Sequence, residues 1–189
     1  RALAIDEKAL GPDHPDVAAT LIGLANSWKG RRDYRKAEPF YRRAIAIHER
    51  AFGSRHPVVA VDLHNLAGLL IENGDIEAAL DTALVVEDIT REHFRLMARA
   101  LSEQEALHYA AVRVKGLDMA LTCAARVPEP SAARRVWDSV IRSRALVLDE
   151  MAVRRRTISS VRDTGLVRLA AQLAATSEQL ANMTVRGRG

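Results

Sequence analysis

The feature that most constrains the fold of this chain is a phrase that its sequence contains twice. Residues 11–25 read GPDHPDVAATLIGLA, and residues 53–67 read GSRHPVVAVDLHNLA. The two copies align at an offset of 42 residues (53 − 11), and the alignment continues on both sides. A fixed period of about 20 to 50 residues is typical of a solenoid, in which each unit buries its apolar face only by stacking on its neighbours. We therefore predict a repeat protein, with a partial unit at residues 1–10 and fuller units at about 11–52 and 53–93.

Each unit reads as two helices. The first begins at the His–Pro step of residues 14–15, because proline is tolerated in the opening turn of a helix, and GRRD at 30–33 ends it. In the second copy, Gly74 suits the left-handed conformation that ends a helix. The second helix is predicted from about Tyr34 to Arg50. Apolar residues recur at helical spacing in both helices. They are Val17, Leu21, Leu24, Ala25 and Trp28 in the first, and Ala37, Tyr41, Ala44 and Ile47 in the second.

Composition agrees with an all-α fold. The 189 residues are 48% hydrophobic, but only 4% are aromatic. Strands favour aromatic and β-branched residues, whereas Ala, Leu, Arg and Glu favour helices. The sequence contains no apolar run of about 18 residues and no signal-peptide pattern at its N-terminus. We therefore expect a cytoplasmic protein that does not contact a membrane.

Seven residues of the first full unit carry a resemblance to a known family. Their spacing resembles that of the tetratricopeptide repeat, whose usual period is about 34 residues. The extra residues lie in the turn ERAFGSRHP at 49–57, and this longer form with its Gly-x-x-His-Pro turn resembles the repeats of kinesin light chains. The resemblance implies an α-solenoid of antiparallel helix pairs over residues 1–93 that binds a protein or peptide. The seven residues are Leu21, Leu24, Ala25, Trp28, Ala37, Tyr41 and Ala44.

The resemblance also implies a ligand site. In this family the first helix of each unit lines a concave groove, and two Asn residues often stand where this chain has Ile22–Gly23 and His64–Asn65. An Asn amide can donate to and accept from a peptide backbone, so we expect Asn65, with His64 and Asn26, to hold a peptide. In the alternative, Asn65 bonds only within its own repeat. The candidate groove residues are Ile22, Asn26, Lys29, Val61, His64, Asn65, Gly68 and Glu72.

Beyond residue 93 the period fails, but the sequence still predicts helices. SEQE at 102–105 is a Ser-x-x-Glu capping box that opens a helix, and Ser131 can cap another after the break at RVPEPS. We predict a helical extension of three helices over residues 94–189, with a flexible C-terminal end. A long helix at 76–98 comes first, and the three helices run from 102 to just before RVPEPS, from 132 to about 157 and from about 164 to 184.

The stretch RRVWDSVIRSRALVLDEMAVRRR at 134–156 carries a second resemblance. It is similar to the helical region that precedes the CHAT domain, a caspase-like cysteine peptidase, in bacterial proteins with such repeats. The resemblance implies that the repeats regulate or position a peptidase domain that begins after Gly189 and is absent from this chain. The catalytic His and Cys of that peptidase therefore have no counterpart here.

The sequence predicts no catalytic residue, no cofactor site and no metal site. Cys123 is the only cysteine, and His108, on the same predicted helix, would lie about 22 Å away along the axis. We expect Cys123 to be a small core residue rather than a nucleophile. None of the six histidines has a metal-ligand partner at i+4 spacing. His14 and His56 recur at one turn position, where we expect them to stabilise the turn by hydrogen bonding.

The arginines of the extension leave a second function open. The formal charge is +4, and a helical scaffold with an arginine-rich tail can bind nucleic acid. However, Arg134, Asp138 and Arg142 have the i, i+4 spacing of ion pairs on a solvated helix face, as do Glu150 and Arg154. We therefore keep nucleic-acid binding as an alternative to protein binding.

Arg144 lies in an unusual position. At 100° per residue it falls in an apolar stripe with Val136 and Trp137, where a charge is costly unless it is paired. We expect an ion pair with a neighbouring segment or a side chain that extends to water. Apolar stripes of this kind also allow the remaining alternative, a structural spacer that associates with itself.

Overall fold

The computed structural model describes residues 2–98, 101, 104–105, 108–109, 115–143, 168–169, 172 and 175, and the chain divides into two compact units, 1–144 and 145–189. Every helix discussed below belongs to the first unit. The described residues contain helices and turns but no strand, which confirms the all-α class. The helices are α1 (Ala2–Leu10), α2 (Pro15–Gly30), α3 (Tyr34–Phe52), α4 (Pro57–Asn73), α5 (Ile76–Ala98) and α7 (Gly116–Ala124), and residues 130–143 are also helical.

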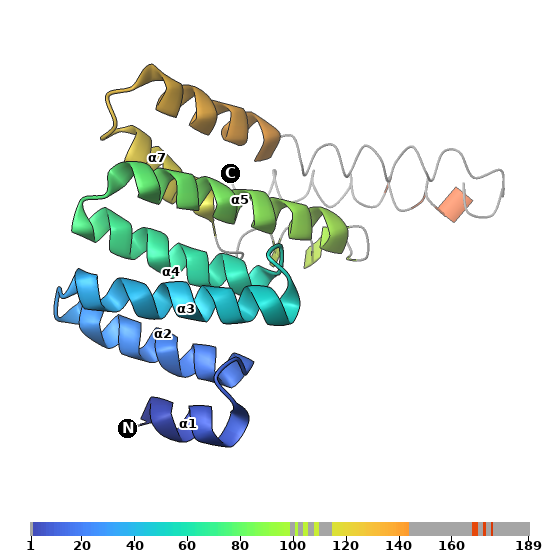
Figure 1. Ribbon diagram of the computed structural model, residues 1–189. Helices are drawn as coiled ribbons and strands as arrows, with labels where there is room; N and C mark the ends of the chain where they lie inside the picture. The colour runs from blue at the N-terminus through green and yellow to red at the C-terminus, as the bar shows by residue number, and fades with distance from the viewer. Residues whose placement is uncertain are drawn as a thin grey trace, which may run out of the picture. The chain divides into compact units, whose positions relative to one another are not determined.

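The helices stack in chain order. α1 packs on α2, α2 on α3, α3 on α4, α4 on α5 and α5 on α7, and Figure 1 shows α2 to α5 lying side by side. Contacts are therefore made mainly between sequence neighbours, as a solenoid requires. Since no described helix is both long and apolar enough, none could cross a bilayer.

Both first helices begin in the predicted way. His14 precedes α2 and His56 precedes α4, and the Nδ1 atom of each accepts a hydrogen bond from the backbone N–H two residues later, at 3.2 Å. Each histidine is followed by a proline, which has no N–H to offer, so the cap acts on the next free donor. The expected turn-stabilising role of the two histidines is confirmed.

The two first helices end at equivalent positions with different chemistry. Gly74 has φ 92°, the left-handed conformation that was predicted, whereas its counterpart Arg32, 42 residues earlier, has φ 60°. A side chain is costly in this region and glycine is not. The second helix of the unit, α3, continues to Phe52, two residues beyond the predicted end at Arg50, and Gly53 ends it with φ 91°.

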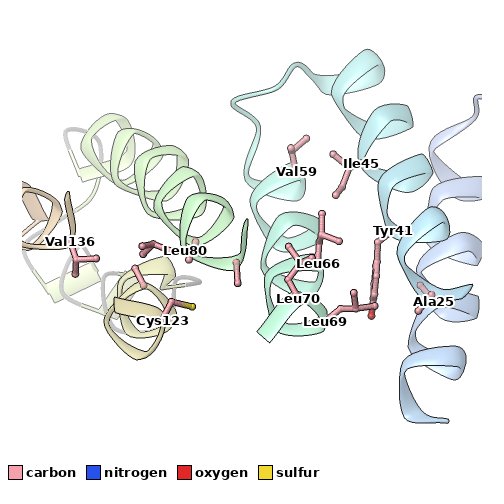
Figure 2. Close-up of a cluster of buried hydrophobic side chains, with 14 of the residues drawn as sticks. Ala25, Tyr41, Ile45, Val59, Leu66, Leu69, Leu70, Leu80, Cys123 and Val136 are labelled. Carbon is pink, nitrogen blue, oxygen red and sulfur yellow. The ribbon is translucent and has the colours of Figure 1, made fainter. Parts of the chain in front are cut away.

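The core follows the predicted apolar faces. Ala25, Ala37, Ala67 and Ala79 are fully buried, so the two helices of each unit approach closely at their small residues. The predicted face of α3 is also buried. One continuous cluster reaches from Ala25 to the helical residues 130–143, and Figure 2 shows its side chains meeting between neighbouring helices.

The segment after α5 differs from the prediction. The helix α5 ends at Ala98 as predicted, but Lys115 has an extended backbone (φ −108°, ψ 109°), so α7 is a separate helix and His108 and Cys123 do not share one. The predicted cap of a helix at Ser102 lies outside the described residues. The prediction failed because the capping box marks only a local preference, whereas the start of α7 depends on its packing against α5.

Gly116 explains where α7 begins. A Cβ atom at this position would lie 2.1 Å from the Ala83 carbonyl oxygen and 2.6 Å from the Glu87 nitrogen, so only glycine lets the backbones of α7 and α5 meet. The helix α7 also contacts α4. It thus packs where the first helix of another unit would, although the sequence period has ended.

The next helix begins earlier than predicted. Pro130 is already helical, and the N–H of Ala132 bonds to the Glu129 carbonyl at 3.0 Å, so Ser131 lies inside the helix and does not cap it. Proline is well suited to the first helical position. The remainder of the predicted helix 132–157 and all but four residues of 164–184 lie outside the described residues. The proposed domain boundary at residue 93 stays a prediction.

Candidate functional site

The candidate residues come from the first helix of each full unit. Ile22, Asn26 and Lys29 lie on α2, and the other five lie on α4. The spacing within each helix is three or four residues, which places the side chains along one side. We call these eight residues the α2–α4 face.

An ion pair joins the two helices of this face. Lys29 Nζ lies 3.1 Å from Glu72 Oε1, and the two side chains are 24% and 48% exposed. The lysine reaches across because Gly68 has no side chain: a Cβ there would lie 3.2 Å from Lys29 Nζ. A partly exposed pair of this kind contributes only about 0–1 kcal/mol to stability, so it fixes the position of the ammonium more than it stabilises the fold.

His64 lies one turn before Gly68 on the same side of α4. Its Nδ1 atom is buried and, among the described residues, has no hydrogen-bond partner. Burial lowers the pKa of His64, and the positive charge of Lys29 lowers it further, so the ring is neutral near pH 7. A buried ring nitrogen without a partner is costly, and a ligand that supplied one would recover that cost.

Asn26 and Asn65 differ in their partners. The Asn26 carbonyl oxygen accepts a hydrogen bond from the hydroxyl of the fully buried Tyr41 on α3. Burial raises the pKa of Tyr41, with a smaller contribution from the charge of Glu72, so this hydroxyl keeps its proton. Asn65 is half-buried, and its side chain makes no hydrogen bond to any residue that the structure describes. Asn26 thus supports its own unit, whereas the Asn65 amide is open to a ligand.

The two apolar members of the face also differ. Ile22 is half-buried and packs against two clusters of the core. Val61 is 44% exposed. Val61 is therefore the apolar contact that this face offers to a partner.

Sequence reasoning missed the polar pairs that join neighbouring units. Thr20 on α2 donates to Asp6 on α1 at 2.6 Å, and His48 on α3 bonds to Asp62 on α4 at 2.5 Å. Asp6 and His48 are equivalent under the 42-residue offset, and so are Thr20 and Asp62. The same joint therefore recurs with different chemistry.

A second pair of positions shows the same behaviour within each unit. Arg50 pairs with Asp13 at 2.8 Å in the first unit, and Glu92 pairs with Arg55 in the second, at positions 42 residues later. The charges are exchanged between the units. This signal was present in the sequence, at positions where the two copies differ rather than where they agree.

Cys123 has the predicted structural role. Its side chain is fully buried in the main core cluster. Burial raises the pKa of the thiol, and the nearby charge of Arg126 opposes this only in part. A protonated, buried thiol is a poor nucleophile. No group of three or more His, Cys, Asp or Glu side chains suited to a metal ion occurs in the described part of the chain.

The predicted ion pairs of the extension need correction. Within residues 130–143 no Arg134–Asp138 pair is seen; Arg142 donates instead to the backbone carbonyl of Asp138 at 3.1 Å, and Arg135 pairs with Asp81 on α5 at 2.6 Å. Spacing along a helix permits a pair but does not favour it over a partner on a neighbouring helix.

The predicted apolar stripe of the extension is also only partly correct. Val136 is buried in the core, as expected, but Trp137 is 62% exposed. Arg144 and the pair Glu150–Arg154 lie outside the described residues.

Comparison with known proteins agrees with the repeat pattern. Residues 29–92, about a third of the chain, match the sequence profile of the tetratricopeptide repeat. Among solved structures, a putative kinesin light chain of Podosopora anserina with nearly identical TPR-like repeats is 17% identical, with a TM-score of 0.44 and coverage of 82% of this chain and 83% of that chain. A variant of the same protein with one substitution is 18% identical, with a TM-score of 0.44 and coverage of 84% of both chains. None of the curated proteins matches the chain. The assignment therefore depends on the match over residues 29–92.

Proposed function

Because residues 29–92 are tetratricopeptide repeats, which form a non-enzymatic scaffold for protein partners, we propose that this chain is an interaction module whose α2–α4 face holds a peptide segment. The segment would run across both first helices, close to the Lys29–Glu72 ion pair. Extended peptides present backbone N–H and C=O groups at regular intervals, and a face of this kind binds them through side-chain donors and acceptors.

The observation that supports this proposal is the set of polar groups left unsatisfied on α4. The Asn65 amide and the His64 Nδ1 atom have no hydrogen-bond partner among the described residues, while Asn26 and Lys29 are already paired. Groups of the first kind gain hydrogen bonds from a ligand without losing any within the protein. Val61 adds an exposed apolar contact beside them.

The proposal extends to the rest of the protein. Residues 1–93 form the binding domain, and residues 94–189 connect it to a CHAT-type peptidase that it regulates or positions in a bacterial cytoplasm. The resemblance of residues 134–156 to the region before such peptidases supports this part. The alternatives, nucleic-acid binding and self-association, lead to different outcomes in the experiment below.

The test begins with a random-peptide library displayed on phage and selected on the whole 189-residue chain. Peptides that bind are then titrated against the wild type and against Asn65→Ala and His64→Ala, with fluorescence anisotropy as the readout. We expect each substitution to weaken binding about tenfold, the effect of losing one or two hydrogen bonds.

Asn73→Ala is the matched control, because this asparagine lies at the end of α4, outside the α2–α4 face, and bonds to Asp75 at 2.5 Å. It should leave the affinity unchanged. Peptides that bind Asn65→Ala and His64→Ala as tightly as the wild type would contradict the proposal. Binding of DNA or RNA that falls steeply with salt and requires Arg134 and Arg142 would favour the nucleic-acid alternative. Light scattering that shows dimers without any peptide bound would favour self-association.

A further inference from the structure

Three of the six histidines lie at the same end of the second unit, away from the α2–α4 face. The ring of His48 lies 5.6 Å from that of Phe52, and the ring of Phe52 stacks on that of His56 at 5.0 Å. His93, on α5, bonds through Nδ1 to the Tyr109 hydroxyl at 2.7 Å. We call these five residues the histidine joint, since they connect the end of α3, the start of α4 and the end of α5.

His56 needs an unprotonated Nδ1 atom to hold α4. This atom accepts the hydrogen bond from the Val58 N–H, so it carries no proton while the cap is formed. A proton there would place a donor against a donor. It would also put a positive charge at the N-terminus of a helix, where the helix dipole disfavours cations.

His93 is sensitive to the same charge. Burial lowers the pKa of His93, and a positive charge on His56 lowers it further. The two rings therefore oppose each other when both are protonated, although they come from different helices.

The charged groups around the joint are already paired. Asp62 bonds to His48 across α3 and α4, and burial raises the pKa of Asp62 against the effect of that hydrogen bond. Glu92, next to His93, pairs with Arg55, next to His56. Neither carboxylate is available to neutralise His56 or His93 without losing its own partner.

The first unit lacks this arrangement. The equivalent cap, His14, faces the Asp16 carboxylate at 3.6 Å, and the residue equivalent to His93 is Ala51. A proton on His14 thus has an acidic neighbour and no opposing histidine. The contrast between two equivalent caps indicates that the second has a property of its own.

We propose that the histidine joint is a pH-sensitive hinge, in which acidification charges His56 and His93 together and separates the first turn of α4 from the end of α5. The hinge lies within the repeats but is distinct from the α2–α4 face, so it gives the chain a way to respond to pH that does not depend on the proposed ligand.

The test measures backbone hydrogen exchange of the whole chain by mass spectrometry at about pH 7.5 and about pH 5.5, corrected for intrinsic exchange rates. In the wild type, we expect opening of residues 56–62 and 90–97 to rise about tenfold at the lower pH, the equivalent of losing one helix cap. In His56→Asn the rise should be less than about threefold, because asparagine caps a helix equally well and does not titrate.

Two further variants separate the hinge from a general acid effect. His14→Asn should leave the rise at residues 56–62 as large as in the wild type, and His93→Gln should reduce it, since the cap still titrates but its neighbour does not. An equal rise in the wild type and in His56→Asn would overturn the proposal. So would a wild type whose exchange at these residues is the same at both pH values.

Discussion

At the scale of single residues, the tightest constraint in the molecule is the contact of Gly116 with α5. A Cβ atom in Gly116→Ala would collide with the Ala83 carbonyl and the Glu87 backbone, neither of which is a flexible side-chain end. We expect this variant to lose about 1–3 kcal/mol of unfolding free energy through overpacking, as measured by urea denaturation. Gly30→Ala is the control, because a Cβ there meets nothing within 4 Å. Equal stability of Gly116→Ala and the wild type would contradict the described packing of α7.

Residues also show what sequence comparison misses. The repeat pattern predicted the buried alanines and the two capping histidines, because these are the same in both copies. It did not predict the His48–Asp62 pair, because the equivalent positions hold Asp6 and Thr20, and only the structure shows that each pair meets. For the candidate site, the pattern identified α2 and α4 but could not show which amides already have partners.

At the scale of helices, the two units predict their own relative strain. Arg32 ends α2 in the left-handed region, where the equivalent Gly74 ends α4 at no cost. We expect Arg32→Gly to raise the free energy of unfolding by up to about 1 kcal/mol, and Gly74→Ala to lower it by a similar amount. Thermal denaturation of both variants gives the two shifts. A loss of stability in Arg32→Gly would mean that the arginine side chain has a role that outweighs its backbone strain.

Helices before and after residue 98 were not equally predictable. α2 to α5 could be predicted within about two residues, since the caps, stops and apolar spacing all agree and occur twice. The helix α7 was not predicted, because its start depends on a close approach to α5 rather than on a local signal. The same reason applies to Ser131, a good cap in isolation that the structure places inside a helix.

At the scale of the whole molecule, the buried histidines predict a loss of stability in acid. Burial lowers the pKa values of His64 and His93, so their contribution is complete above the unfolded value of about 6.5 and is lost as the pH falls below it. Asp62 has a raised pKa and therefore acts with the opposite sign, since its contribution is lost as the pH rises. Urea denaturation at about pH 7.5 and about pH 5 should show a lower midpoint in acid. The double variant His64→Gln, His93→Gln should show a smaller difference, and a wild type that is more stable in acid would contradict this assignment.

The central claim for the whole chain is that its repeats hold a peptide on the α2–α4 face. The most direct measurement is a nuclear magnetic resonance titration of the isotopically labelled chain with a peptide selected from the library. We predict that the side-chain amide of Asn65 and the ring of His64 shift with saturation, while the amide of Asn73, outside the face on the same helix, stays in place. Saturable shifts confined to other residues, with Asn65 and His64 unchanged, would contradict the claim.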